Sequence, residues 1–153
     1  MLARFWENGA LMYEGQGAGL DGGRGFNIAA IDQATGRLRD PIQRFDTWAS
    51  RSTGTSTNAM VAYLDSVPNG TLLLIAVADE AGLNDWSSCT LLTSPWTNAA
   101  LGRLQQLGST QIGNYCYGDQ WAMIAVKGQG AALSESLGHA AADAPTQATV
   151  QLP

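Results

Sequence analysis

The sequence predicts a single domain that mixes helices and strands, with a helix covering at least one face of a sheet. The chain has 153 residues, which is enough to bury one hydrophobic core, and 45% of them are apolar. Several apolar runs are nearly continuous and end at turn signals, which is typical of buried strands. Two other segments space their apolar residues as amphipathic helices do.

The first strand expected along the main body of the chain covers residues 26–32, where apolar residues follow one another almost without a break. The turn sequence Gln33-Ala34-Thr35-Gly36 then predicts a hairpin. Residues 37–45 can return as the antiparallel partner of this strand. Pro41 lies inside that segment, and since proline has no amide hydrogen, it favours an edge position or a bulge there.

Two further apolar runs predict buried strands at 71–77 and 121–126, and the first of these is expected to be central and covered on both faces. A short strand is possible at residues 11–13. The alternating residues 146–152 can form a last strand. Residues 130–144 are expected to be weakly structured.

The first helix is expected to begin among residues 53–57, which offer N-cap side chains, and to end near Val67, before Pro68. The second is expected to begin at Ser94-Pro95, because serine caps helices and proline suits the first helical position. Gly108 fits its end. The apolar stripes are Met60, Val61, Leu64 and Val67 in the first helix and Leu101, Leu104 and Leu107 in the second.

The charge balance excludes some classes of partner. The formal net charge is −5 and the basic residues are scattered, which argues against a nucleic-acid partner. No run approaches the ~18–20 apolar residues that cross a bilayer, so no membrane insertion is expected. The first residues lack the apolar core of a signal peptide, and the compartment stays undetermined.

The two cysteines, Cys89 and Cys116, allow one disulfide or none, and their spacing does not decide between these. His139 is expected to be a loop residue. Because no other histidine or cysteine lies near it at ligand spacing, no metal and no cofactor are expected.

Arg24 stands between two glycines in Gly22-Gly23-Arg24-Gly25. Glycine allows positive φ and close approach of other groups, so this arginine has little steric cover. It is either a solvated loop charge or a side chain presented to a ligand.

Six short motifs in a fixed order resemble one known family. They are Gly23-Arg24-Gly25-Phe26-Asn27-Ile28, Gln33-Ala34-Thr35-Gly36, Phe45-Asp46-Thr47, Asp79-Glu80, Leu107-Gly108-Ser109-Thr110, and Asp119-Gln120-Trp121-Ala122-Met123 followed by Lys127-Gly128. Together they resemble the ILEI/PANDER-like domain, which occurs in the interleukin-like EMT inducer family and in the stem of protein O-mannose N-acetylglucosaminyltransferase. The resemblance assigns residues 20–153 to this domain and leaves 1–19 as an N-terminal segment.

The resemblance implies an α+β fold, a compact single domain of two mainly antiparallel β-sheets, in the manner of a β-sandwich, flanked by two or three short helices. In the transferase stem this domain is similar to a sugar-binding module without chemistry of its own. Its glycine-flanked arginine matches Arg24, and its aspartate after the central strand matches Asp79. A second arginine falls at Gly118, where this chain departs from the pattern. Cys89 lies in an insertion, so the animal disulfide pattern does not transfer.

A sugar site needs a planar donor, a carboxylate acceptor and an aromatic surface. Arg24 offers the donor, and Asp79 or Asp119 offers the acceptor. The aromatic surface is then expected from Trp86, Trp96 or Tyr117. The alternative is a structural ion pair between Arg24 and an aspartate that fixes the loops, with the aromatic residues in the core.

The sequence therefore favours a non-catalytic, lectin-like module that binds a glycan or glycoprotein, as part of a bacterial or phage surface or tail assembly. No spacing marks an acid–base pair or an activated nucleophile, so no catalytic residue and no enzyme activity are expected. One alternative is a structural subunit of a virion or complex that contacts other subunits. Another is a secreted signalling ligand.

Overall fold

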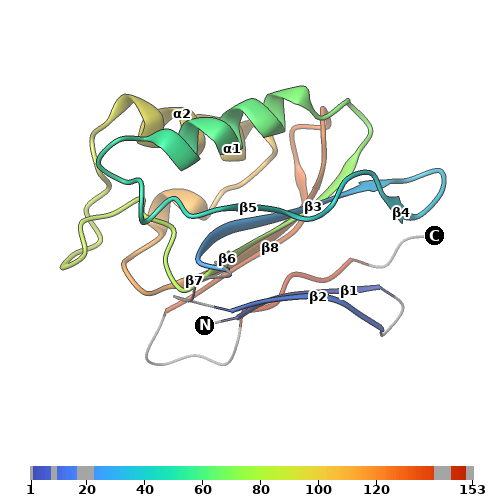
Figure 1. Cartoon of the computed structure of the whole chain (residues 1–153), viewed down its shortest axis with the longest axis horizontal. Helices are drawn as coiled ribbons and strands as arrows, with labels where there is room; N and C mark the ends of the chain where they lie inside the picture. Colours follow the sequence, from blue (N-terminus) through green and yellow to red (C-terminus); the bar gives the residue numbers. More distant parts are fainter. Residues whose placement is uncertain (1, 8–9, 17–22, 140–145, 151–153) are drawn as a thin grey trace.

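The computed structural model describes residues 2–7, 10–16, 23–139 and 146–150. Its centre is a six-stranded antiparallel sheet in the order β4-β3-β6-β7-β8, with β5 also paired to β3 (Figure 1). The strands are β3 (Gly25–Asp32), β4 (Arg37–Leu38), β5 (Gln43–Phe45), β6 (Leu72–Ala78), β7 (Gln120–Val126) and β8 (Ala132–Gly138). The domain is thus a compact α+β unit built on one main sheet.

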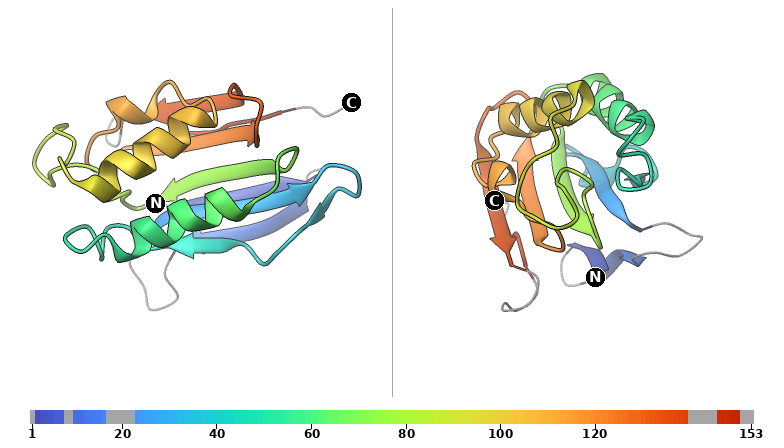
Figure 2. Two further views of the ribbon diagram at one scale, coloured as in Figure 1. Left: turned by 90° about the horizontal axis from the view of Figure 1, so that it is seen from above. Right: turned by 90° about the vertical axis from the view of Figure 1, so that its left-hand side faces the viewer.

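Two helices, α1 (Thr55–Ser66) and α2 (Pro95–Gln106), lie side by side on one face of this sheet, and a 3-10 helix, η1 (Ile112–Asn114), follows α2 (Figures 1 and 2). Ser94 caps α2 as expected, because its side chain accepts a hydrogen bond from the Thr97 amide at 3.1 Å. Met60 and Leu64 of α1 and Leu104 of α2 are buried in the core, as their spacing predicted. No helix in the described part of the chain is long and apolar enough to cross a membrane.

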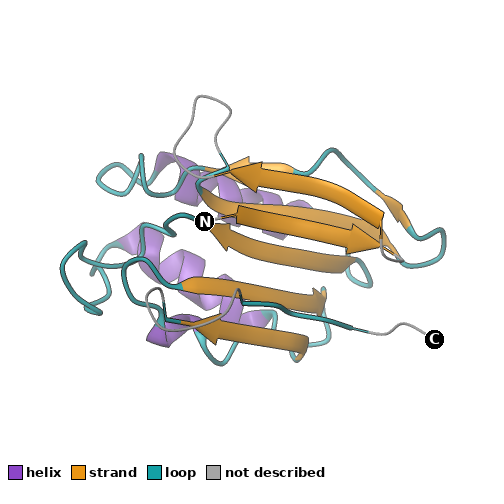
Figure 3. Cartoon of the chain, turned by 90° about the horizontal axis from the view of Figure 1, so that it is seen from below, coloured by secondary structure: helices purple, strands orange, loops and turns teal. Residues whose placement is uncertain are grey.

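The opposite face of the sheet is covered by the hairpin of β1 (Leu2–Glu7) and β2 (Ala10–Gln16) and by residues 146–150 (Figures 1 and 3). Ala148 and Val150 pack against a cluster on this face formed by Ile31, Leu72, Ile124 and Val126. The predicted sandwich of two β-sheets is therefore not confirmed. One sheet of six strands carries the fold, and the second layer is a two-stranded hairpin.

The three strongest strand predictions are confirmed. They correspond to β3, β6 and β7, and β6 is central, between the other two. The segment 37–45 forms two short strands instead of one, with Pro41 in the gap between them. Both pair with β3 at the edge of the sheet, as expected for a segment with a missing amide hydrogen.

Two predictions of local structure are wrong. Residues 132–138, within the segment expected to be weakly structured, form the edge strand β8. Residues 146–150 pack on the sheet without pairing as a strand, and residues 151 and 152 lie outside the described residues. The isolated short strand expected at 11–13 is the middle of a longer strand, β2.

Candidate functional site

Three loops meet at the end of the main sheet where β6 finishes. We call residues 46–54, 79–92 and 115–119 together the loop end. Thr47 Oγ1 donates a hydrogen bond to the Ala81 carbonyl oxygen at 2.5 Å, which joins the first loop to the second. Asn84 Nδ2 donates to the Tyr115 carbonyl oxygen at 2.5 Å, which joins the second to the third. Buried polar groups need such partners, so the loops fix one another's positions.

Arg24, immediately before β3, forms a two-pronged ion pair with Asp46 and not with Asp79. Its Nε lies 3.0 Å from Asp46 Oδ1 and its Nη2 lies 2.8 Å from Asp46 Oδ2. The pair forms because β3 and β5 are neighbours, with Phe26 opposite Phe45. The hydrogen bonds that Arg24 donates to Asp46, together with the negative charges of Asp46 and Asp79, raise the pKa of Arg24 above its ordinary value, although burial opposes this. The structure thus favours the ion-pair alternative for Arg24.

Glu80, the residue after Asp79, is buried and joins two of the loops. Its Oε1 accepts a hydrogen bond from the Gly82 amide at 3.0 Å, and its Oε2 accepts one from the Gly118 amide at 2.7 Å. Burial raises the pKa of this carboxyl above its usual value in spite of these hydrogen bonds. Asp79 itself is half-buried and adopts a positive φ of 63°, which is uncommon for a residue with a side chain.

Asp119, a predicted ligand acceptor, is only 3% exposed and its contacts are internal. Its Oδ2 accepts a hydrogen bond from the Cys116 amide at 2.8 Å and lies 3.0 Å from His139 Nδ1. The buried hydroxyl of Tyr115 donates to the Asp119 carbonyl oxygen at 3.0 Å and accepts from the Ala81 amide at 3.3 Å. Burial strongly raises the pKa of this tyrosine.

Cys89 and Cys116 form a disulfide, which resolves the alternative that their spacing left open. The bridge ties the loop that carries Trp86 to the loop that carries Tyr117. His139 follows β8 and reaches this region because Gly138 pairs with Gln120 in the sheet. The ligand atoms of Cys116, Asp119 and His139 lie within 4.8 Å of one another, although no metal site was expected from the sequence.

The loop end carries three side chains in mutual contact around Trp48, namely Trp48, Arg51 and Tyr117, which we call the aromatic platform. The ring centroids of Trp48 and Tyr117 are 5.4 Å apart, and Arg51 Cζ lies 4.0 Å from the centroid of the Trp48 ring. Tyr117 is 46% exposed, and Trp86, on the disulfide-linked loop, is 67% exposed. Both predicted aromatic residues are thus accessible, while their role as ligand contacts stays a prediction.

Trp96, the other aromatic candidate, has a structural role at the start of α2. Its indole nitrogen donates a hydrogen bond to the Arg51 carbonyl oxygen at 3.1 Å. Its ring packs so closely on Gly54 that a Cβ at position 54 would lie 2.5 Å from ring carbons. Gly54 precedes α1, so this contact locks the beginnings of the two helices together.

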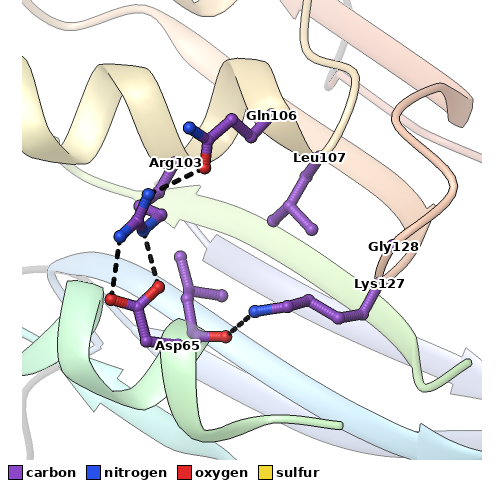
Figure 4. A pocket seen from close by; sticks show the side chains of 7 residues that line it. Asp65, Arg103, Gln106, Leu107, Lys127 and Gly128 are labelled. Carbon is purple, nitrogen blue, oxygen red and sulfur yellow. Dashed lines mark hydrogen bonds and ion pairs between the residues drawn. The ribbon is translucent and has the colours of Figure 1, made fainter. Parts of the chain in front are cut away.

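A cavity of about 330 Å³ lies at the other end of the sheet, lined by Leu64, Asp65, Arg103, Gln106, Leu107, Lys127 and Gly128 (Figure 4). Arg103 of α2 is paired with Asp65 of α1, and Lys127 Nζ donates to the Leu64 carbonyl oxygen. Leu72 pairs with Val126, which places this cavity at the start of β6, away from the loop end. None of the predicted site residues Arg24, Asp79, Asp119, Tyr117 and Trp86 lines it.

The ion pair predicts a measurable coupling between Arg24 and Asp46. Their side chains are 24% and 34% exposed, and a two-pronged pair of this kind contributes about 1 kcal/mol to the free energy of unfolding. We expect urea denaturation of Arg24→Ala, Asp46→Ala and the double variant to give that coupling energy. Arg24→Lys should not restore it fully, because an ammonium lacks the planar fork. Independent, additive effects would contradict a structural pair.

Sequence reasoning missed the partner of Arg24 and two members of the aromatic platform, Trp48 and Arg51. Asp46 stood in the quoted motif Phe45-Asp46-Thr47, so its presence was visible but its pairing was not. Trp48 follows that motif directly, and Arg51 comes three residues later. The signal that could have found them is their spacing, because Arg51 lies three positions after Trp48 in the same loop. At this spacing the arginine side chain can lie over the aromatic ring.

The sequence matches the family described as Interleukin-like EMT inducer over residues 24–129. Three similar proteins are Protein FAM3C of Xenopus laevis, Bos taurus and Rattus norvegicus. The Xenopus laevis and Bos taurus proteins are 30% and 29% identical to the chain over 108 residues, and the Rattus norvegicus protein is 27% identical over 106 residues. In each case the match covers 69% of this chain and 39% of the relative. The chain thus spans 39% of the length of the curated relatives it matches.

These findings correct the predicted function. The relatives are animal proteins and the matched family is described as interleukin-like, so the prediction of a lectin-like module in a bacterial or phage assembly is wrong. The interpretation as a phage-tail protein is wrong for the same reason, and the alternative of a structural subunit of a virion or complex gains no support. The resemblance on which the prediction was built is confirmed, because the match spans most of the described core of the domain. The chain belongs to the Interleukin-like EMT inducer family.

Proposed function

We propose that this domain is a non-catalytic, interleukin-like ligand domain that binds a protein partner at the cell surface through the aromatic platform. The family match gives the class of function. The observation that carries the choice of surface is the contact of the half-buried Trp48 with the exposed side chains of Arg51 and Tyr117. Tryptophan, tyrosine and arginine are the side chains that most often dominate the energy of protein interfaces.

The surroundings of the platform support binding without catalysis. Three carboxylates at the loop end have internal partners: Asp46 holds Arg24, Glu80 accepts two backbone amides, and Asp119 contacts Cys116 and His139. Hydrogen bonds between the loops, together with the disulfide, hold the platform in one arrangement before any partner arrives. Such preorganisation lowers the entropy lost on binding. The net charge of −5 further favours a protein over a nucleic acid.

The test is saturable binding of the fluorescently labelled chain to cultured animal cells. We expect Tyr117→Ala and Arg51→Ala each to weaken binding by about 30-fold, which corresponds to about 2 kcal/mol at a central interface residue. Leu133→Ala is the matched control, because Leu133 is 43% exposed but lies on β8 near its far end from the platform. The control should bind as the parent chain does.

The identity of the partner is tested on the same cells. Mild protease treatment of the cell surface should abolish binding, and enzymatic removal of surface glycans should leave it unchanged. Loss of binding after glycan removal alone would contradict a protein partner. Full binding by Tyr117→Ala and Arg51→Ala would contradict the aromatic platform as the contact surface, and no saturable binding at all would contradict the ligand function.

A further inference from the structure

Four side chains with metal-binding chemistry gather beside the aromatic platform: Cys89, Cys116, Asp119 and His139. The ligand atoms of Cys116, Asp119 and His139 lie within 4.8 Å of one another. The Cys89 sulfur is bonded to that of Cys116, so it lies directly beside this group of three. Three separate segments of the chain supply these residues, and the fold brings them together.

The arrangement of this cluster has supports other than the disulfide. Asp119 is buried, and its Oδ2 accepts the Cys116 amide at 2.8 Å. The Asp119 amide in turn donates to the Cys116 carbonyl oxygen at 3.1 Å, which closes the turn between the two residues. His139 is placed by β8, with its Nδ1 3.0 Å from Asp119 Oδ2. None of these contacts involves the sulfur–sulfur bond, so we expect them to persist when that bond is open.

We propose that reduction of the Cys89–Cys116 disulfide converts this cluster into a zinc site with Cys89, Cys116, His139 and Asp119 as its four ligands. Zinc prefers four ligands in a tetrahedron and accepts thiolate sulfur, imidazole nitrogen and carboxylate oxygen. With zinc–ligand distances of about 2.0–2.3 Å, such ligand atoms lie within about 4 Å of one another. The ligand atoms of Cys116, Asp119 and His139 already lie within 4.8 Å of one another, and the two sulfurs must move apart to about 4 Å once their bond is open.

The conversion balances in two steps. A dithiol reductant breaks the sulfur–sulfur bond by thiol–disulfide exchange: it supplies two electrons and two protons, leaves two thiols on the chain and becomes a disulfide itself. Zn²⁺ then replaces the two thiol protons, which are released to solvent as the thiolates bind the metal. Both states link the loop of Trp86 to the loop of Tyr117, so the loop end keeps its form under oxidising and reducing conditions.

The experiment titrates Zn²⁺ into the intact chain with and without tris(2-carboxyethyl)phosphine, and repeats the titration with Co²⁺ as a spectroscopic probe. We expect one zinc per reduced chain, no comparable binding to the oxidised chain, and a Co²⁺ spectrum with tetrahedral d–d and thiolate charge-transfer bands. Loss of a residue that only supports a metal ligand weakens metal binding by about 10- to 100-fold. His139→Gln removes a ligand itself, so it should weaken zinc binding to the reduced chain by at least this factor. Asp85→Asn is the control, since Asp85 is exposed on the same loop but outside the cluster.

Circular dichroism of the reduced chain distinguishes a folded chain that does not bind zinc from a chain that has unfolded. A reduced chain that stays folded, or that folds when Zn²⁺ is added, and that loses zinc in Cys89→Ser and His139→Gln supports the proposal. The proposal is overturned by a folded reduced chain that binds Zn²⁺ no better than His139→Gln does. It is equally overturned by a reduced chain that unfolds and that Zn²⁺ does not restore.

Discussion

Replacing Gly25 with alanine is expected to lower the free energy of unfolding by about 3 kcal/mol or more. Gly25 is the first residue of β3 and has a φ of +91°, where a residue with a side chain is strained by about 1–3 kcal/mol. In addition, a Cβ at this position would lie 2.0 Å from the Phe45 carbonyl oxygen and 2.9 Å from the Thr47 amide nitrogen. Both are backbone atoms of the neighbouring segment, so they cannot turn aside as a flexible side chain could.

Gly70→Ala is the matched control for this effect. Gly70 also has a positive φ, +84°, but a Cβ there would meet nothing within 4 Å. Its substitution carries only the conformational cost of about 1–2 kcal/mol, so the difference between the two variants in urea denaturation measures the clash. Equal losses for the two variants would show that β5 yields easily, and would contradict a rigid contact at the base of the loop end.

The Gly-Arg-Gly motif around Arg24 could be interpreted only in part from the sequence. A glycine pair beside an arginine indicates either an exposed charge or close backbone approach, and the sequence does not say what approaches. In the structure, β5 comes close enough to Gly25 to place Asp46 against Arg24. The expected partner, Asp79, also follows a strand next to β3, so the local pattern was the same for both carboxylates. Only the tertiary pairing of β3 with β5 decides between them.

The elements that could be predicted are those whose apolar pattern is continuous. β3, β6 and β7 are buried on both faces, so their sequences read as strands without knowledge of their neighbours. β8 could not be recognised in this way. It is an edge strand, Ala-Leu-Ser-Glu-Ser-Leu-Gly, whose polar residues are half-buried and whose Leu133 is exposed. Its pairing with β7 comes from its neighbour and not from its own hydrophobicity.

Glu135, in the middle of β8, interrupts any hydrophobic pattern in this strand, and its contacts explain why a charged residue lies there. Its carboxylate accepts hydrogen bonds from the side chains of Ser109, Thr110 and Trp121, the last at 2.9 Å. It also accepts the backbone amides of Thr110, at 2.8 Å, and Gln111. These groups belong to the segment between α2 and η1 and to β7, so one carboxylate fixes the end of the helical layer to the edge of the sheet.

Glu135→Gln is expected to destabilise the domain by about 3 kcal/mol at neutral pH. An amide keeps the shape of the side chain but has a single acceptor oxygen, and its NH₂ group would face donors. Hydrogen bonds to a charged group contribute about 1.5–3 kcal/mol each, and more than one is lost. Urea denaturation monitored by tryptophan fluorescence measures the loss. Glu80→Gln serves as the comparison, because Glu80 is also a hydrogen-bonded carboxylate but its pKa is shifted in the other direction.

The pH dependence of this loss identifies the ionised carboxylate as its cause. Burial alone would raise the pKa of Glu135, but the hydrogen bonds from Ser109, Thr110 and Trp121 outweigh it and hold the pKa below its usual value of 4.5. The unfolded chain therefore takes up the proton first as the pH falls, so the stabilising effect of Glu135 is complete above about pH 4.5 and disappears below the folded pKa. The difference in the free energy of unfolding between the parent and Glu135→Gln should shrink over that range.

For Glu80 the pKa is raised, so its contribution to the free energy of unfolding should decrease as the pH rises through 4.5 towards the folded value. A Glu135→Gln loss that stays constant from pH 7 to about 3 would mean that packing, and not the charged hydrogen-bond network, holds β8 to the domain.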